Sequence, residues 1–88
     1  MSYGLGIAGD ARADLREMDL WLQEEFWDEL ERISADPSLI VEGADDLFYS
    51  FTRAHAAQKH YVTMTIARND QSRTITVLGI THRQRASP

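Results

Sequence analysis

The sequence predicts an α+β domain in which a helical hairpin packs on a small antiparallel sheet, with elements in the order β-α-α-β-β-β. Three observations support this class. Apolar residues recur every three or four positions over residues 11–33, the period of an amphipathic helix. Apolar and polar residues alternate over residues 47–53 and 60–67, which is typical of half-buried strands. A β-branched run over residues 73–80 indicates a strand inside a sheet.

The N-terminal residues predict a short first strand over residues 2–8, because Tyr3, Leu5 and Ile7 alternate with small residues. Asp10 comes next and is of the residue type that caps a helix. We therefore expect Asp10 to be the N-cap of the first helix.

The helical region carries one apolar stripe and an acidic opposite face, which suits a helix with one solvated side. The stripe consists of Leu15, Met18, Leu22, Phe26, Leu30 and Ile33. One long helix would satisfy this pattern, but a helical hairpin is favoured because Asp19 can cap a second helix and residues 20–22 interrupt the polar face. Pro37 disfavours a helical residue before it, so the helical region should end by Asp36.

The second half of the chain predicts a connection over residues 37–46 and then three strands. Within the connection, residues 39–41 are expected to pin the loop to the core or to form a short edge segment. A polar, alanine-rich connection is expected over residues 54–59 and a turn over residues 69–72. The expected inner face of the last hairpin holds Val62, Met64, Ile66, Ile75 and Val77.

The length and composition of the chain limit the kinds of protein that it can be. Eighty-eight residues form one domain, residues 1–88, and an apolar content of 43% suffices for a compact core. The chain has no cysteine, no apolar run long enough to span a bilayer and no pattern of a signal peptide. We expect a soluble, cytoplasmic protein that makes no membrane contact.

The charge is unevenly distributed along the chain. Residues 1–52 hold thirteen acidic residues against three arginines, a balance of −10. Residues 53–88 hold six basic residues against one aspartate, a balance of +5 before the histidines are counted. This asymmetry predicts one surface for polyanions on a body that otherwise repels them. The alternative is that the two halves neutralise each other across the fold.

Several motifs occur in a characteristic order. The helical region contains Asp14-Leu15 and closes with the segment 33–37, Ile-Ser-Ala-Asp-Pro. The last strand, residues 76–83, ends in His82-Arg83. In this order the chain resembles the RelE/ParE superfamily of bacterial toxins from type II toxin–antitoxin systems, which include plasmid stabilisation systems, over nearly its whole length.

The resemblance implies a toxin that is neutralised by a cognate antitoxin protein. One branch of the family acts at the ribosome as an mRNA interferase, and another inhibits DNA gyrase. In the first branch, basic residues on the exposed sheet face stabilise charge on the scissile phosphate while the RNA 2′-hydroxyl attacks. We rank ribosome-dependent mRNA cleavage first, because the C-terminal half is basic. The alternatives are a gyrase inhibitor and a catalytically degenerate interaction protein.

The resemblance also suggests site residues. Arg83 matches the terminal arginine and Arg85 a second basic position, while Lys59 and Arg53 are expected as flanking charges. The catalytic set is incomplete, because Ser50 and Thr52 stand where some members carry lysines and no tyrosine follows before Pro88.

Proton transfer is assigned to His60 or His82, since imidazole titrates near neutrality. Tyr61 could stack on a base, although strand propensity alone explains a tyrosine there. No metal site is expected, because the three histidines, His55, His60 and His82, include no close ligand pair such as i, i+4 on a helix, and no cofactor is expected. Trp21 and Trp27 are expected in the core, with homodimerisation through them as an alternative.

Overall fold

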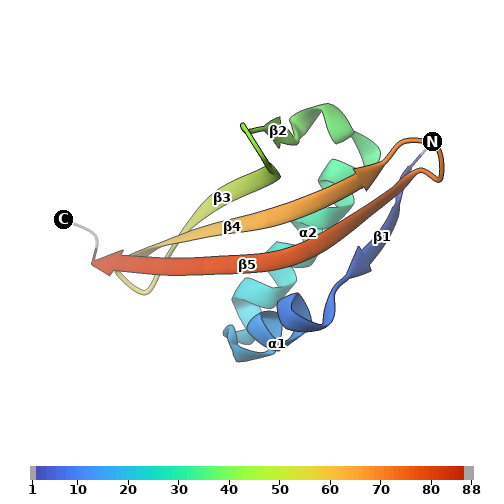
Figure 1. Ribbon diagram of the computed structural model, residues 1–88. Coiled ribbons are helices and arrows are strands. Elements are labelled where there is room, and N and C mark those ends of the chain that lie inside the picture. The colour runs from blue at the N-terminus through green and yellow to red at the C-terminus, as the bar shows by residue number, and fades with distance from the viewer. Residues whose placement is uncertain (1, 87–88) are drawn as a thin grey trace.

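A computed structural model describes residues 2–86 of the chain and contains eight elements (Figure 1). These are β1 (Gly4–Ile7), α1 (Gly9–Glu17), α2 (Leu20–Ala35), the 3₁₀ turn η1 (Pro37–Leu39), β2 (Val41–Glu42), β3 (Leu47–His55), β4 (Gln58–Asn69) and β5 (Thr74–Ala86). The strands form one sheet in the order β1-β5-β4-β3-β2, and both helices lie on the same side of it (Figure 1). The predicted α+β class is confirmed.

The sheet is mixed, which corrects the expectation of a purely antiparallel sheet. β1 pairs with β5 in parallel, from Gly4 opposite Thr74 to Ile7 opposite Val77. A parallel pair needs a long connection between its strands. Here both helices and the other strands lie between β1 and β5 in the chain, so β1 joins the sheet beside its last strand.

The core lies between α2 and the inner face of the sheet, the face that the helices cover. Phe26, Leu30 and Ile33 of α2 are fully buried. The five residues expected on the inner face, Val62, Met64, Ile66, Ile75 and Val77, are at most 3% exposed. The predicted alternation of β4 and of the start of β5 is therefore confirmed.

The helical region is two helices, as the hairpin interpretation favoured. Met18 has an extended backbone that ends α1, and Asp19 takes the N-cap position of α2, where its carbonyl accepts from the amides of Leu22 and Gln23. The expected role of Asp10 is wrong, since Ala8 is the N-cap of α1 and Asp10 lies in its first turn. A carboxylate there is favourable because it faces the positive end of the helix dipole.

The connection between β3 and β4 is much shorter than expected. The strands continue to His55 and from Gln58, so only Ala56 and Ala57 form the turn. Both have positive φ, 53° and 61°, as a tight two-residue hairpin requires. Alanine rarely adopts this conformation, so residues 54–59 contain no sequence signal for a two-residue turn.

β5 contains an irregularity that reverses its alternation. Thr65 pairs with Gly79 and Ile66 with Val77, so Leu78 has no partner on β4 and is 45% exposed. An extra residue of this kind is a β-bulge, after which odd and even positions exchange faces. Beyond Leu78 the even residues of β5 therefore face the helices.

Candidate functional site

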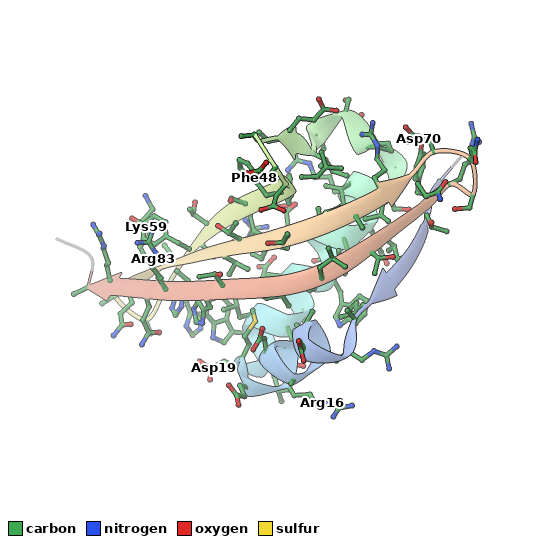
Figure 2. All side chains as sticks on the ribbon, viewed as in Figure 1. Arg16, Asp19, Phe48, Lys59, Asp70 and Arg83 are labelled. Carbon is green, nitrogen blue, oxygen red and sulfur yellow. The ribbon has the colours of Figure 1, made fainter. Side chains whose placement is uncertain are left out.

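The basic face is a cluster on the outer side of the sheet, opposite the helices, formed by Lys59, Tyr61, Arg83 and Arg85. Lys59 pairs with Arg85 and Tyr61 with Arg83 across β4 and β5, so all four side chains project from the same side. The Lys59 Nζ atom lies 5.5 Å from the centre of the Tyr61 ring, within range of a cation–π contact. Figure 2 shows Lys59 and Arg83 together near the C-terminal end of β5.

The cations of the basic face keep their charge unpaired within residues 2–86. No carboxylate of that range forms an ion pair with Lys59, Arg83 or Arg85. Three like charges on adjacent strands repel one another, and an anion bound between them would relieve that repulsion. The cluster is therefore suited to bind an anion.

Hydroxyl groups extend the basic face toward β3. Thr52 pairs with Tyr61, and the hydroxyls of Ser50 and Thr63 lie 2.8 Å apart in a cross-strand hydrogen bond. The alternation along β4 places Thr63 on the same outward face as Tyr61, but Thr63 was not among the site residues expected from the sequence. These groups add neutral hydrogen-bonding capacity where lysines were expected from the resemblance.

Arg53 does not join the basic face. It lies on the inner face, where its Nη2 atom is 3.0 Å from Glu29 Oε1 and its Nε atom 3.3 Å from Glu25 Oε2. Its charge ties β3 to α2, so the expectation of Arg53 as a flanking charge for substrate is not met.

The structure also separates His60 and His82 from Arg83. Both histidines lie on the inner face, because His60 is an even position of β4 and His82 follows the bulge in β5. The His60 Nδ1 atom lies 3.0 Å from the His82 Nε2 atom. Their rings are thus held against each other on the opposite side of the sheet from the basic face, out of reach of a phosphate bound there.

Aromatic contacts surround this histidine pair. The Trp21 ring packs edge-on against His60, with ring centres 4.9 Å apart, and stacks on His55 at 4.1 Å. His60 is 5% exposed, whereas His82 reaches the surface. Partial burial lowers the pKa of His82, the neighbouring His60 lowers it further, and the Asp19 carboxylate opposes both effects.

A cleft of about 280 Å³ opens beside the pair between α1 and β5. Its lining residues are Asp14, Glu17, Met18, Ile80 and His82. Within residues 2–86, no group of three or more histidine, aspartate or glutamate side chains is arranged to hold a metal ion. No helix in that range is both long enough and apolar enough to cross a membrane.

Comparison of the fold with solved structures gives consistent matches. The free E. coli toxin RelE carrying two arginine-to-alanine substitutions aligns with a TM-score of 0.70 at 16% identity, over 91% of this chain and 82% of that one. A chain of the intact E. coli RelBE toxin–antitoxin complex aligns with a TM-score of 0.68 at 15% identity, over 96% of this chain and 100% of that one. The Mycobacterium tuberculosis toxin–antitoxin complex RelBE2 aligns at 0.66 and 13% identity, over 94% and 100%.

No protein-family model matches the sequence, and no curated protein matches it significantly. The structural matches extend over almost the whole chain, but identities of 13–16% establish shared architecture only. The chain has the RelE toxin fold.

Proposed function

We propose that this chain is the toxin of a type II toxin–antitoxin system and that its basic face contacts mRNA on the ribosome and promotes cleavage. The observation that carries the proposal is the cluster of three unpaired cations and one tyrosine on the uncovered side of a RelE-like sheet. Unpaired arginine and lysine side chains recognise phosphate, and the partly exposed ring of Tyr61 offers a platform for an unstacked base.

The proposed reaction needs little covalent chemistry from the protein. The RNA 2′-hydroxyl attacks the adjacent phosphorus and gives its proton to water, the bond to the 5′ oxygen breaks, that oxygen leaves as a hydroxyl after taking up a proton, and a 2′,3′-cyclic phosphate remains. Arg83 and Arg85 stabilise the negative charge that builds on the phosphate oxygens, with Lys59 beside them. The Tyr61 hydroxyl, directly across from Arg83, is a proton donor within the same cluster.

The proposed partner is an antitoxin protein. Two of the similar structures are toxin–antitoxin complexes, and the sheet of this chain has uncovered backbone at the edge strands β1 and β2. An antitoxin could add a strand at such an edge and lay acidic residues on the basic face.

Expression in a bacterial host without an antitoxin tests the toxin assignment. Wild-type protein should arrest growth, and Arg83→Ala should relieve the arrest because a main phosphate contact is lost. Arg16→Ala is the matched control, since it removes an exposed arginine from α1 on the helical side. Normal growth at high expression of wild-type protein would refute the toxin assignment.

Cell-free translation with mapping of mRNA ends tests the reaction. Wild-type protein should produce ribosome-dependent cuts, and Arg83→Ala should slow cutting by about 10²–10³-fold, the usual effect of losing one donor to a developing anion. Uncut mRNA together with loss of gyrase supercoiling activity would favour the gyrase alternative. Uncut mRNA, active gyrase and a tight antitoxin complex would favour a degenerate binding module, to which Ser50 and Thr52 in place of lysines already point.

A further inference from the structure

The histidine clamp, defined as His60 and His82, has no role in the function proposed above. Its position on the sheet nevertheless relates it to the basic face. On β4 and β5, His60 pairs with Gln84, Tyr61 with Arg83, and Val62 with His82. The contact between His60 and His82 is therefore a diagonal one that crosses the Tyr61–Arg83 pair from the other side of the sheet.

The clamp joins β4 and β5 where β5 is exposed. From residue 81 to residue 86, all of β5 is exposed, whereas His60 is anchored beneath Trp21 of α2. Through His60, the 3.0 Å contact links this exposed end of β5 to the helix layer. Because Arg83 directly follows His82 in the chain, this link limits movement of Arg83.

We propose that the histidine clamp is a positioning device that holds Arg83 opposite Tyr61, and that protonation of both rings releases it and weakens RNA binding by the basic face. The inference rests on the proposed function, since it assigns a regulator to the same RNA-binding surface. Its chemistry is specific to a pair of imidazoles. A hydrogen bond between two ring nitrogens needs one lone pair, and two imidazolium rings have only N–H donors to offer each other.

The charged groups around the clamp include some that favour protonation of its rings and some that oppose it. Asp14 and Glu17 of α1 line the cleft together with His82, and Asp19 lies between the helices near the same ring. On β3, Arg53 pairs with His60, and His55 stacks on the Trp21 ring that packs against His60. The carboxylates favour protonation, while Arg53 is neutralised by Glu25 and Glu29. The opposing effects of burial and of the His60 ring dominate at His82, whose pKa is lowered.

The direction of this shift sets the direction of the pH effect. An unfolded histidine has a pKa of about 6.5, and in the folded protein the pKa of His82 lies below that. The unfolded or released state therefore binds more protons than the clamped state below about pH 6.5. The charge of the His60 ring is one cause of the lowered pKa of His82, so the proton taken up by His82 is the one that leaves both rings without a lone pair. Clamping is therefore fully favourable above about pH 6.5 and is lost as the pH falls through the lowered pKa of His82.

The predicted trend is opposite to that of simple electrostatics. Protonated histidines add positive charge, which by itself would tighten the binding of RNA in acid. Release of the clamp predicts weaker binding in acid, because Arg83 is no longer held opposite Tyr61. The sign of the pH dependence therefore distinguishes the two mechanisms.

The test is the affinity of the full chain for a short fluorescein-labelled single-stranded RNA, measured by anisotropy at constant ionic strength at about pH 7.5 and about pH 5.5. Wild-type protein should bind about fivefold more weakly in acid, the lower end of typical couplings between two sites. His82→Gln and His60→Gln should each abolish this fivefold difference in affinity between the two pH values. His55→Gln, which changes a histidine outside the clamp, and Arg16→Ala should retain it.

Amide hydrogen exchange provides a readout that needs neither RNA nor a variant. After correction for intrinsic rates, residues 59–62 and 81–85 of wild-type protein should lose protection in acid, while residues 74–77 should not. Unchanged or tighter RNA binding in acid, or unchanged protection of these residues, would overturn the clamp. RNA binding that is absent at both pH values would instead refute the proposed function, and the exchange data would then decide the clamp alone.

Discussion

At the scale of single residues, Glu29 is the charged group whose surroundings matter most for stability. Its side chain is 5% exposed, and it accepts hydrogen bonds from the Tyr49 hydroxyl and from Arg53 Nη2, both at 3.0 Å. Burial and the bond to Glu29 raise the pKa of Tyr49. A buried carboxylate is stable only when paired, so this network fixes α2 against β3.

Replacing Arg53 tests this network. Arg53→Ala should lower the free energy of unfolding by about 2 kcal/mol, below the usual cost of breaking a buried pair because Arg53 is partly exposed. Urea denaturation measures the loss. Arg32→Ala is the control, since Arg32 is 63% exposed and lies 3.9 Å from the same carboxylate. Equal losses in the two variants would contradict a special role for Arg53.

At the scale of elements, the hairpin of β3 and β4 contains avoidable strain. Ala56 and Ala57 both adopt left-handed backbone, which costs an alanine roughly 1 kcal/mol relative to glycine. The sequence Asn-Gly is the one best suited to this turn.

The double substitution Ala56→Asn with Ala57→Gly should therefore stabilise the protein. We expect an increase of about 1 kcal/mol, equivalent to a rise of roughly 4–8 °C in Tm for a domain of this size. Calorimetry checks the prediction. Ala54→Gly in β3 is the control and should destabilise the protein, because a glycine within a strand relieves no left-handed backbone and loses more conformational freedom on folding than alanine does. A lower Tm for the double variant would contradict the turn geometry.

The bulge at Leu78 is the element that determines which side chains meet. Without it, the alternation of Ile75 and Val77 would place Arg83 on the inner face and His82 on the outer face. With it, Arg83 joins Lys59 and Tyr61 in one cluster, and His82 meets His60 in another. Both functional proposals depend on this single extra residue.

At the scale of the whole molecule, the charge asymmetry of the sequence becomes a separation between two layers. Acidic residues concentrate on the helices, while the uncovered side of the sheet carries Lys59, Arg83 and Arg85. The alternative of mutual neutralisation across the fold applies to Arg53, which pairs with Glu25 and Glu29. One uncovered cationic surface thus remains on a chain with a net charge of −5.

The salt dependence of RNA binding measures how many of these cations take part. Three phosphate contacts predict a slope of roughly −2 for log affinity against log salt concentration with single-stranded RNA. Arg85→Ala should reduce the magnitude of the slope by about 0.7, and Arg73→Ala, in the turn that precedes β5, should leave it unchanged. A slope near zero would mean that the basic face does not bind phosphate.

The sequence by itself determined the class, the order of the elements and most of the core, because periodicity reports directly which side of a helix or strand is buried. It also identified Arg83, Arg85, Lys59 and Tyr61, which the structure brings together. It grouped His60 and His82 with Arg83, which the structure places on the opposite face of the sheet, and it did not include Thr63 among the site residues. Only the tertiary structure decided the faces. The face to which the odd or even residues of a strand point depends on how the strand pairs with its neighbour. The bulge at Leu78 reverses these faces in β5, and it arises from pairing with β4, so no local sequence pattern reveals it.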